Sequence, residues 1–254
     1  MELKALILRA PGINRDADAA LACELAGARP ERVHVNRVAE GSVKLADYAL
    51  LVIPGGFSYG DHLGAGRLLA VDLIHRLGEE LERFVADGRP VIGICNGFQV
   101  LVKAGLLPGP TRQPPRVTLT TNESCQFECR WVQLEAVSNS RCLFTRGIEH
   151  PIEVPVAHGE GRIAVRDQAT LDELEAAGLV ALRYVGEGYP ANPNGSPHNI
   201  AGLCNAQGNV LGLMPHPENA VLPHQHPRWT REPSRREGDG LQIFRNAVRY
   251  AASL

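Results

Sequence analysis

Residues 91–101, VIGICNGFQVL, place a cysteine at the point where an apolar run gives way to a helical pattern. The apolar residues predict a strand buried on both faces, and the residues after the cysteine predict a helix. Cys95 then lies at the junction, with Gly93 before it and Gly97 after it. Because these glycines carry no side chain, a sharp turn from strand to helix can pack closely against its neighbours. The arrangement is typical of open α/β sheets, where ligands bind at the carboxyl ends of parallel strands.

The rest of the first half of the chain alternates in the same way between short apolar runs and helical patterns. Strands are predicted at residues 3–9, 32–38, 48–54 and 90–94, and helices at 15–28, 65–87 and 96–105. This order predicts an α/β fold built on a doubly wound, flavodoxin-like and mostly parallel sheet with helices on both faces.

The second half of the chain has the alternating pattern of antiparallel strands. Strands are predicted within 117–137 and 151–165, and at 179–185, 199–206 and 209–215. The tripeptide QGN at 207–209 is typical of a hairpin turn. A final helix is expected at 240–253, after a polar, proline-rich surface loop at 222–238. These patterns predict a single domain, residues 1–254, in which an antiparallel β insertion decorates the main sheet.

The composition of the 254 residues is that of an ordinary globular protein, with 44% hydrophobic and 21% charged residues. A net charge of −2 and an aromatic content of 5% predict no nucleic-acid partner and no binding to an acidic membrane. We expect neither a signal peptide nor a membrane-spanning helix, and therefore a cytoplasmic protein. The six cysteines lack the spacing of a disulfide framework and are expected to be free thiols. The CxxxC pair Cys125 and Cys129 has no second pair, so no metal site is predicted.

The position of Cys95 is compatible with two interpretations. A thiol between a central strand and the N-terminus of a helix lies where backbone N–H groups favour the thiolate, as in a nucleophile elbow. The alternative is a buried structural cysteine, which is the commonest fate of this residue type. The two flanking glycines favour the nucleophile.

A nucleophilic thiol needs a base, and His216 is the candidate among nine histidines. It follows an apolar strand in LGLMPHPENA, and Glu218 comes two residues later. Pro215 and Pro217 favour an extended segment, in which residues two apart point the same way. We therefore expect an imidazole oriented by a neighbouring carboxylate. The alternative is a loop with incidental polar residues.

Acyl transfer also needs hydrogen-bond donors for a developing oxyanion. The loop IPGGFSYGD (53–61) follows a buried strand, and Gly55 and Gly56 leave its backbone N–H groups open to a ligand, although a simple tight turn can have this sequence too. The N–H of Asn96, next after the nucleophile, is the predicted second donor. Gln99 lies one helical turn after the nucleophile and is predicted to contact the substrate or to cap a groove.

Five segments together resemble one family of enzymes. They are GICNGFQ around the cysteine, IPGGFSYGD, VPVAHGEGR (154–162), NPNGSPHNIAGLCN (192–205) and MPHPE (214–218). Over nearly its whole length the chain is similar to the class I (triad) glutamine amidotransferases. The cysteine and the His-x-Glu pair are the marks of that superfamily. The other segments narrow the resemblance to the glutaminase subunits of phosphoribosylformylglycinamidine synthases.

The resemblance implies a glutaminase that hydrolyses glutamine and supplies ammonia for purine biosynthesis. Cys95 would be the nucleophile, His216 the acid and base, and Glu218 the residue that orients the imidazole, while the N–H groups of Gly56 and Asn96 hold the oxyanion. The resemblance also implies two partners, a large synthetase subunit and a small accessory subunit. The synthetase would use ATP and Mg²⁺. This chain lacks the G-x-x-x-x-G-K-[ST] pattern and is expected to bind no cofactor itself.

Two functions from other classes remain as alternatives. A different cysteine hydrolase of the same fold would lack specificity for glutamine, and the His-x-Glu pair would be unexpected in it. A glutamine-sensing or scaffold protein that has kept the fold would have no need of Cys95, His216 and Glu218 together. His158, in the AHGEG turn, either lines the site or the ammonia exit, or is a structural histidine.

Overall fold

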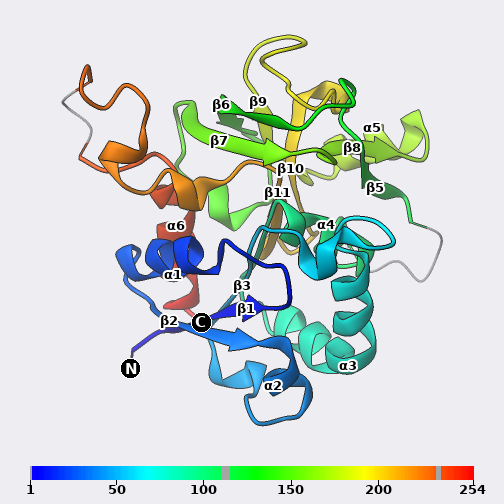
Figure 1. Cartoon of the computed structure of the whole chain (residues 1–254), viewed down its shortest axis with the longest axis vertical. Coiled ribbons are helices and arrows are strands. Elements are labelled where there is room, and N and C mark those ends of the chain that lie inside the picture. The colour runs from blue at the N-terminus through cyan, green and yellow to red at the C-terminus, as the bar shows by residue number, and fades with distance from the viewer. Residues whose placement is uncertain (1, 110–114, 233–235) are drawn as a thin grey trace.

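A mixed β-sheet forms the centre of the fold in the computed structural model (Figure 1), which describes residues 2–109, 115–232 and 236–254. Within these residues, nine strands form one sheet in the order β2–β1–β3–β4–β11–β10–β9–β6–β7. Its parallel part contains β1 (Lys4–Arg9), β2 (Arg29–His34), β3 (Leu50–Ile53), β4 (Val91–Ile94) and β11 (Val210–Leu213). Its antiparallel part contains β10 (Ile200–Cys204), β9 (Val180–Tyr184), β6 (Glu128–Ala136) and β7 (Ile152–His158). The predicted α/β class, with its parallel sheet and antiparallel insertion, is confirmed.

The middle strands of the parallel part are apolar throughout because they have no solvent-facing side. All residues of β3, β4 and β11 are buried, as expected of strands covered on both faces. β4 pairs with β3 on one side and with β11 on the other. The carboxyl end of β4, where Cys95 follows, therefore lies at the centre of the sheet edge.

The antiparallel insertion continues the main sheet and does not decorate it from outside. β10 and β11 form the predicted hairpin, and β9, β6 and β7 follow in turn. Two further strands, β5 (Val117–Thr120) and β8 (Arg162–Val165), pair only with each other in a small separate sheet. The two strands predicted within 151–165 thus belong to different sheets, and the glycine-rich turn between them carries the chain from one to the other.

Helices cover both faces of the parallel part. α1 (Asp16–Leu25) packs against α6 (Leu241–Ala251) on one face, and α3 (Arg67–Ala86) packs against α4 (Asn96–Lys103) on the other (Figure 1). Among the helices of the described ranges, none combines the length and the apolar character needed to cross a membrane.

Two short helices were not predicted from the sequence. The predicted strand at 32–38 is wrong beyond His34, because Val35 begins helix α2 (Val35–Ala39). The side chain of His34 accepts a hydrogen bond from the N–H of Asn36 and so caps this helix. Helix α5 (Gln168–Ala176) is capped in the same way by Asp167. Of the predicted surface loop at 222–238, residues 233–235 lie outside the described residues.

Helix α4 approaches the sheet so closely that two positions have no room for a side chain. A Cβ atom on Gly93 would lie 2.5 Å from Cδ1 of Leu101 and 2.6 Å from the carbonyl oxygen of Gly97. A Cβ atom on Gly97 would overlap the carbonyl oxygen of Ile53 in β3. The glycines that flank Cys95 therefore set the distance between helix and sheet.

We expect Gly97→Ala to lower the free energy of unfolding by about 1–3 kcal/mol, because the new methyl group must displace α4 or β3. Gly78→Ala is the matched control, since Gly78 is also helical but a Cβ atom there would approach nothing closer than 4.0 Å. Alanine at this control position should stabilise the helix by about 0.5–1 kcal/mol. Urea unfolding of the two variants measures the difference, and a Gly97→Ala variant as stable as the wild type would contradict the close packing.

Candidate active site

Cys95 joins β4 to α4 through a backbone conformation that residues with side chains rarely adopt. Its φ is 52° and its ψ is −106°, and such a conformation costs about 1–3 kcal/mol unless the surroundings enforce it. The N–H of Cys95 donates to the carbonyl of Leu213 at 2.8 Å, which ties the turn to β11. The Sγ atom lies 3.6 Å from the carbonyl oxygen of Ala157 in β7. The thiol thus stands in front of the N-terminus of α4, at the sheet edge where the sequence predicted it.

His216 and Glu218 form a buried pair. Nδ1 of the imidazole lies 2.6 Å from Oε1 of the carboxylate, and the exposed fractions of the two side chains are 3% and 0%. The N–H of His216 donates to the carbonyl of Pro155 at 2.8 Å, which holds the segment against β7. The expected extended geometry is wrong, because Pro217–Asn219 form a 3₁₀ turn. This turn brings the carboxylate back beside the imidazole.

Gly55 lies next to both the imidazole of His216 and the side chain of Cys95, and its missing side chain leaves room for them. A Cβ atom on Gly55 would lie 2.8 Å from Cε1 of His216 and 3.5 Å from Cβ of Cys95. The side chains of His216 and Cys95 therefore border the same glycine. The sequence predicted that Gly55 contacts the substrate through an open backbone, and the structure adds that its missing side chain makes room for the imidazole ring.

The charges around His216 favour its protonated form. Burial by itself would lower the pKa of His216, but the negative charges of Glu218 and Cys95 raise it to about 10. The Nε2 atom of His216 has no hydrogen-bond partner in the described part of the chain. A proton on this nitrogen is therefore free to move to a reacting group, which is the requirement for general acid catalysis.

Two backbone N–H groups beside the thiol are free. No hydrogen bond within the described residues uses the N–H of Gly56 or that of Asn96. Gly56 has a φ of 143°, and a Cβ atom there would lie 2.7 Å from the carbonyl oxygen of Gly12, so other residues do not fit. The N–H of Phe57 donates to this same carbonyl at 2.9 Å and fixes the loop. The two free donors are the groups that the sequence predicted for an oxyanion.

The side chains of Asn96 and Gln99 are hydrogen-bonded within the protein. Asn96 accepts from the N–H of Ser58 at 3.1 Å, and its amide donates to Asp61 at 3.1 Å and to Gln99 at 2.9 Å. The amide of Gln99 donates to the carbonyl of Glu160 at 2.7 Å. The two residues therefore connect the loop after β3 to the turn after β7, across the N-terminus of α4.

A frame of buried amides, which was not predicted from the sequence, supports the turn after β7. Asn194 donates to the carbonyl of Gly161 at 2.8 Å, and the hydroxyl of Ser196 accepts from the N–H of Ile163 at 3.0 Å. From the other side, Asn122 accepts from the N–H of Gly161 at 2.9 Å. The NPNGS segment contributed to the resemblance, but nothing in its pattern indicates that its amides face this turn.

His158 at the end of β7 is held by the same frame. Its Nδ1 atom lies 3.1 Å from Oδ1 of Asn122. Burial and the positive charge of His216 lower the pKa of His158 to about 4, so its ring is neutral at neutral pH. The hydrogen bond of His158 to Asn122 is that of a structural histidine. Its electrostatic interaction with His216 shows that it also lies near the candidate site.

One side-chain cluster has the composition of a metal site. Ligand atoms of Glu153, His226 and Glu232 lie within 4.8 Å of one another. The guanidinium of Arg228 already donates to Glu153 at 2.9 Å and to Glu232 at 2.6 Å. The positive charge of Arg228 thus balances the charges of these two carboxylates. His226 is buried here, although the sequence analysis placed it in a polar surface loop.

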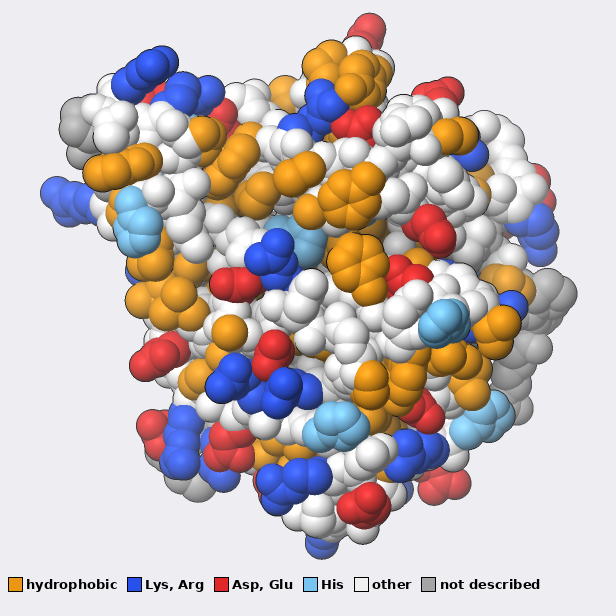
Figure 2. Space-filling model, viewed as in Figure 1, with side chains coloured by type: hydrophobic (Ala, Val, Ile, Leu, Met, Phe, Trp, Pro, Cys, Tyr) orange, Lys and Arg blue, Asp and Glu red, His pale blue; other side chains and the backbone are white. Residues whose placement is uncertain are grey.

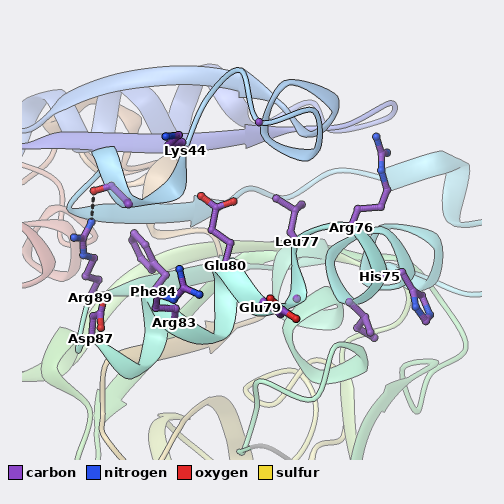
Figure 3. Close-up of a pocket in the computed structure, with 14 residues that line it drawn as sticks. Lys44, His75, Arg76, Leu77, Glu79, Glu80, Arg83, Phe84, Asp87 and Arg89 are labelled. Atoms are coloured by element: carbon purple, nitrogen blue, oxygen red, sulfur yellow. Dashed lines mark hydrogen bonds between the residues drawn. The ribbon is translucent and has the colours of Figure 1, made fainter.

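A surface cavity of about 780 Å³ lies apart from the thiol (Figure 3). Figure 3 shows that its lining comes from α3, from the segment that carries Lys44 and from Asp87 and Arg89, which follow α3. Side chains of both charges, among them Arg83 and Glu80, border it. None of the predicted site residues is in this lining.

The comparisons with known proteins agree with this geometry. The model of the CobB/CobQ-like glutamine amidotransferase domain matches residues 2–251. A "Phosphoribosylformylglycinamidine synthase subunit PurQ" of Dehalococcoides mccartyi is 45% identical, over 98% of each chain. The chain belongs to the PurQ family of glutamine amidotransferases. A second PurQ relative, from Thermus thermophilus, is 41% identical over 97% of this chain and 98% of its own length.

Solved structures agree with this family membership. A chain of the "Structure of PurLQS from Thermotoga maritima" is 36% identical, with a TM-score of 0.76 and coverage of 98% of this chain and 99% of that chain. A glutamine amidotransferase from Thermotoga maritima, 16% identical with a TM-score of 0.59 and full coverage of both chains, shares the fold. The resemblance drawn from the sequence is confirmed.

We expect Glu218→Gln to lower the pKa of His216, because burial is then opposed by one charge fewer. In the wild type, a pKa raised from 6.5 to about 10 means that protonation of His216 stabilises the fold. This contribution is complete below about pH 6.5 and is lost as the pH rises through about 10. Nitrogen NMR of the His216 ring across this range measures the shift. Glu175→Gln, which removes the partner of the exposed His198, is the control and should leave the pKa of His216 unchanged. If His216 titrates at the same pH in the wild type and in Glu218→Gln, the carboxylate of Glu218 is not what raises the pKa of His216.

Proposed function

We propose that this chain is the glutaminase subunit of a phosphoribosylformylglycinamidine synthase. It hydrolyses glutamine to glutamate and passes ammonia to an ATP-dependent synthetase subunit, which converts formylglycinamide ribonucleotide to formylglycinamidine ribonucleotide. The observation that carries the proposal is the strained turn at Cys95 with the buried His216–Glu218 pair beside it. The names of the PurQ relatives support the same function.

The proposed catalytic residues are Cys95, His216 and Glu218. The thiolate of Cys95 attacks the carbon of the glutamine side-chain amide, and a carbon–sulfur bond forms as the carbonyl oxygen takes up negative charge. His216 gives its proton to the amide nitrogen, the carbon–nitrogen bond breaks, and ammonia leaves. Water then attacks the glutamyl thioester while His216 accepts a proton from it, and glutamate and the thiolate are released. Glu218 keeps the imidazole oriented and balances its charge.

The proposed oxyanion donors are the free N–H groups of Gly56 and Asn96. Removing one such donor typically costs about 10²–10³ in rate, so the shape of the loop at Gly55 and Gly56 matters more than its side chains. Gly55, Gly56, Asn96 and Gln99 are proposed to border the bound glutamine. The internal hydrogen bonds of Asn96 and Gln99 support a role in holding this border in place.

The proposed assembly contains a large synthetase subunit and a small accessory subunit. The name PurLQS, which the related structure from Thermotoga maritima carries, combines the letters L, Q and S and supports a complex of three kinds of subunit. In this proposal ATP and Mg²⁺ act on the synthetase, and the present chain binds no cofactor. The nine-stranded sheet, which takes strands from both halves of the chain, supports a single amidotransferase domain over residues 1–254. The proposed compartment is the cytoplasm.

Peptide mass spectrometry after treatment with an electrophilic glutamine analogue tests the nucleophile. We expect labelling at Cys95 that excess glutamine prevents, both in the complex and, if the isolated chain is active, in the chain alone. Labelling at another cysteine, or none in either sample, would remove the proposed mechanism.

We expect Cys95→Ser to lower glutamine hydrolysis by about 10⁴-fold or more, because the alkoxide is far harder to form than the thiolate. The complex should keep its synthesis from added ammonium, since that step does not use the cysteine. Steady-state assays with each nitrogen source separate the two activities. Cys125→Ser is the control, because Cys125 is an exposed thiol outside the site; a Cys95→Ser complex that still hydrolyses glutamine would favour a scaffold role for this chain.

A further inference from the structure

Loop 57–66, from Phe57 to Gly66, exposes apolar side chains beside the active site. Leu63 is 81% exposed and Phe57 is 48% exposed. The loop follows Gly56 directly and leads into α3. Figure 2 shows several exposed apolar side chains in the middle of the face that Figure 1 also views. Exposed apolar groups that gather around a reaction centre mark an interaction surface.

The backbone of loop 57–66 makes the leucine unusual. Tyr59, Asp61 and Leu63 have φ values of 54°, 54° and 62°, in the left-handed region that favours glycine. Aspartate tolerates this region because its side chain bonds locally, but leucine has no such compensation. Leu63 therefore strains the isolated chain and places its whole side chain in water. Neither the core nor the local backbone of this chain benefits from a leucine at this position.

Loop 57–66 is connected to both proposed oxyanion donors, to Asn96 by hydrogen bonds and to Gly56 through the chain. The side chain of Asn96 accepts from the N–H of Ser58 and donates to Asp61, both at 3.1 Å. The backbone of Asn96 supplies one donor, and Gly56, the residue before the loop, supplies the other. A protein that binds the loop is thus coupled to the site through short covalent and hydrogen-bonded connections.

We propose that loop 57–66 is the surface on which the synthetase subunit docks, and that Leu63 is its anchor. The proposal rests on the proposed function. Ammonia that escapes into water is protonated and is then no longer a nucleophile, so the subunit that consumes it has to cover the place where it forms. Loop 57–66 lies at that place, and an apolar side chain that fills a pocket on a partner is a typical centre of a protein interface.

A third exposed apolar residue lies close to the turn after β7. Phe127 is 54% exposed, and its Cδ2 atom would lie 3.7 Å from a Cβ atom on Gly159. The turn that contains Gly159 is joined to α4 through the bond from Gln99 to the carbonyl of Glu160. Exposed apolar side chains thus belong to, or lie next to, both segments that are hydrogen-bonded to the first turn of α4, and one partner can contact both segments.

The test measures how tightly variants of this chain assemble with the cognate synthetase and accessory subunits. We expect Leu63→Asp to raise the apparent Kd for the synthetase by at least about tenfold, with the melting temperature and the labelling of Cys95 by the glutamine analogue retained. Leu25→Asp is the matched control, because Leu25 is a 39% exposed leucine at the end of α1. Its Kd should stay within about twofold of the wild type.

Leu63→Gly separates the contribution of the leucine side chain to docking from the backbone strain at this position. Glycine accepts the left-handed backbone, so this variant should melt at a higher temperature than the wild type and still dock more weakly. Wild-type affinity of Leu63→Asp for the synthetase, or an equal loss in Leu25→Asp, would overturn the docking surface. Loss of a chain dimer instead of the synthetase complex would also overturn it, in favour of a second copy. Failure of the wild type to be labelled at Cys95 would count against the proposed function itself.

Discussion

The close approach of α4 to the sheet is the constraint on which the active site depends. The first turn of this helix lies against the carbonyl oxygen of Ile53, and Gly97 is the residue that permits it. Because the helix starts so near the strand, the chain has a single residue in which to reverse direction, and Cys95 takes up the strained conformation that results. Asn96 is the first residue of this helix, and its N–H makes no hydrogen bond within the described residues. The proposed nucleophile and one proposed oxyanion donor thus depend on one packing contact.

The buried imidazole of His216 and carboxylate of Glu218 depend on a balance between the cost of burial and the attraction of their charges. Removing Glu218 and His216 from water is costly, and the mutual attraction of their charges offsets this cost only if their geometry is good. The 3₁₀ turn after Pro217 supplies that geometry, and the glycine at position 55 leaves room for the ring. The fold therefore stabilises a protonated imidazole in a place where burial alone would have neutralised it. The protonated state of His216 thus depends on packing as well as on charge.

The sequence predicted the elements whose signals are local. The apolar runs of β3 and β4 are continuous because both of their faces are covered, and Cys95 and the His-x-Glu pair stand out by their position after such runs. Val35 and Val38 were assigned to a strand, because Val33 and Val35 alternate with polar residues as in a strand. The same residues also fit the end of β2 followed by the first turn of α2, and the local pattern does not distinguish the two. The pairing of β7 with β6 and of β8 with β5 depends on tertiary contacts, which one-dimensional patterns do not contain. The amide frame around the turn after β7 could not be predicted either, because asparagines in loops rarely reveal their partners.

That amide frame has a consequence for the behaviour of the enzyme in different media. Asn122, Asn194 and Ser196 hold the turn with groups that carry no charge and bind no proton in the physiological range. The ring of His158, which Asn122 holds by a hydrogen bond, stays neutral above about pH 4. The wall of the site therefore keeps its hydrogen bonds when acidity or salt concentration changes, while the titrating groups lie inside it. Rigidity and reactivity are assigned to chemically different residues, because uncharged side chains hold the turn while the imidazole of His216 carries the proton.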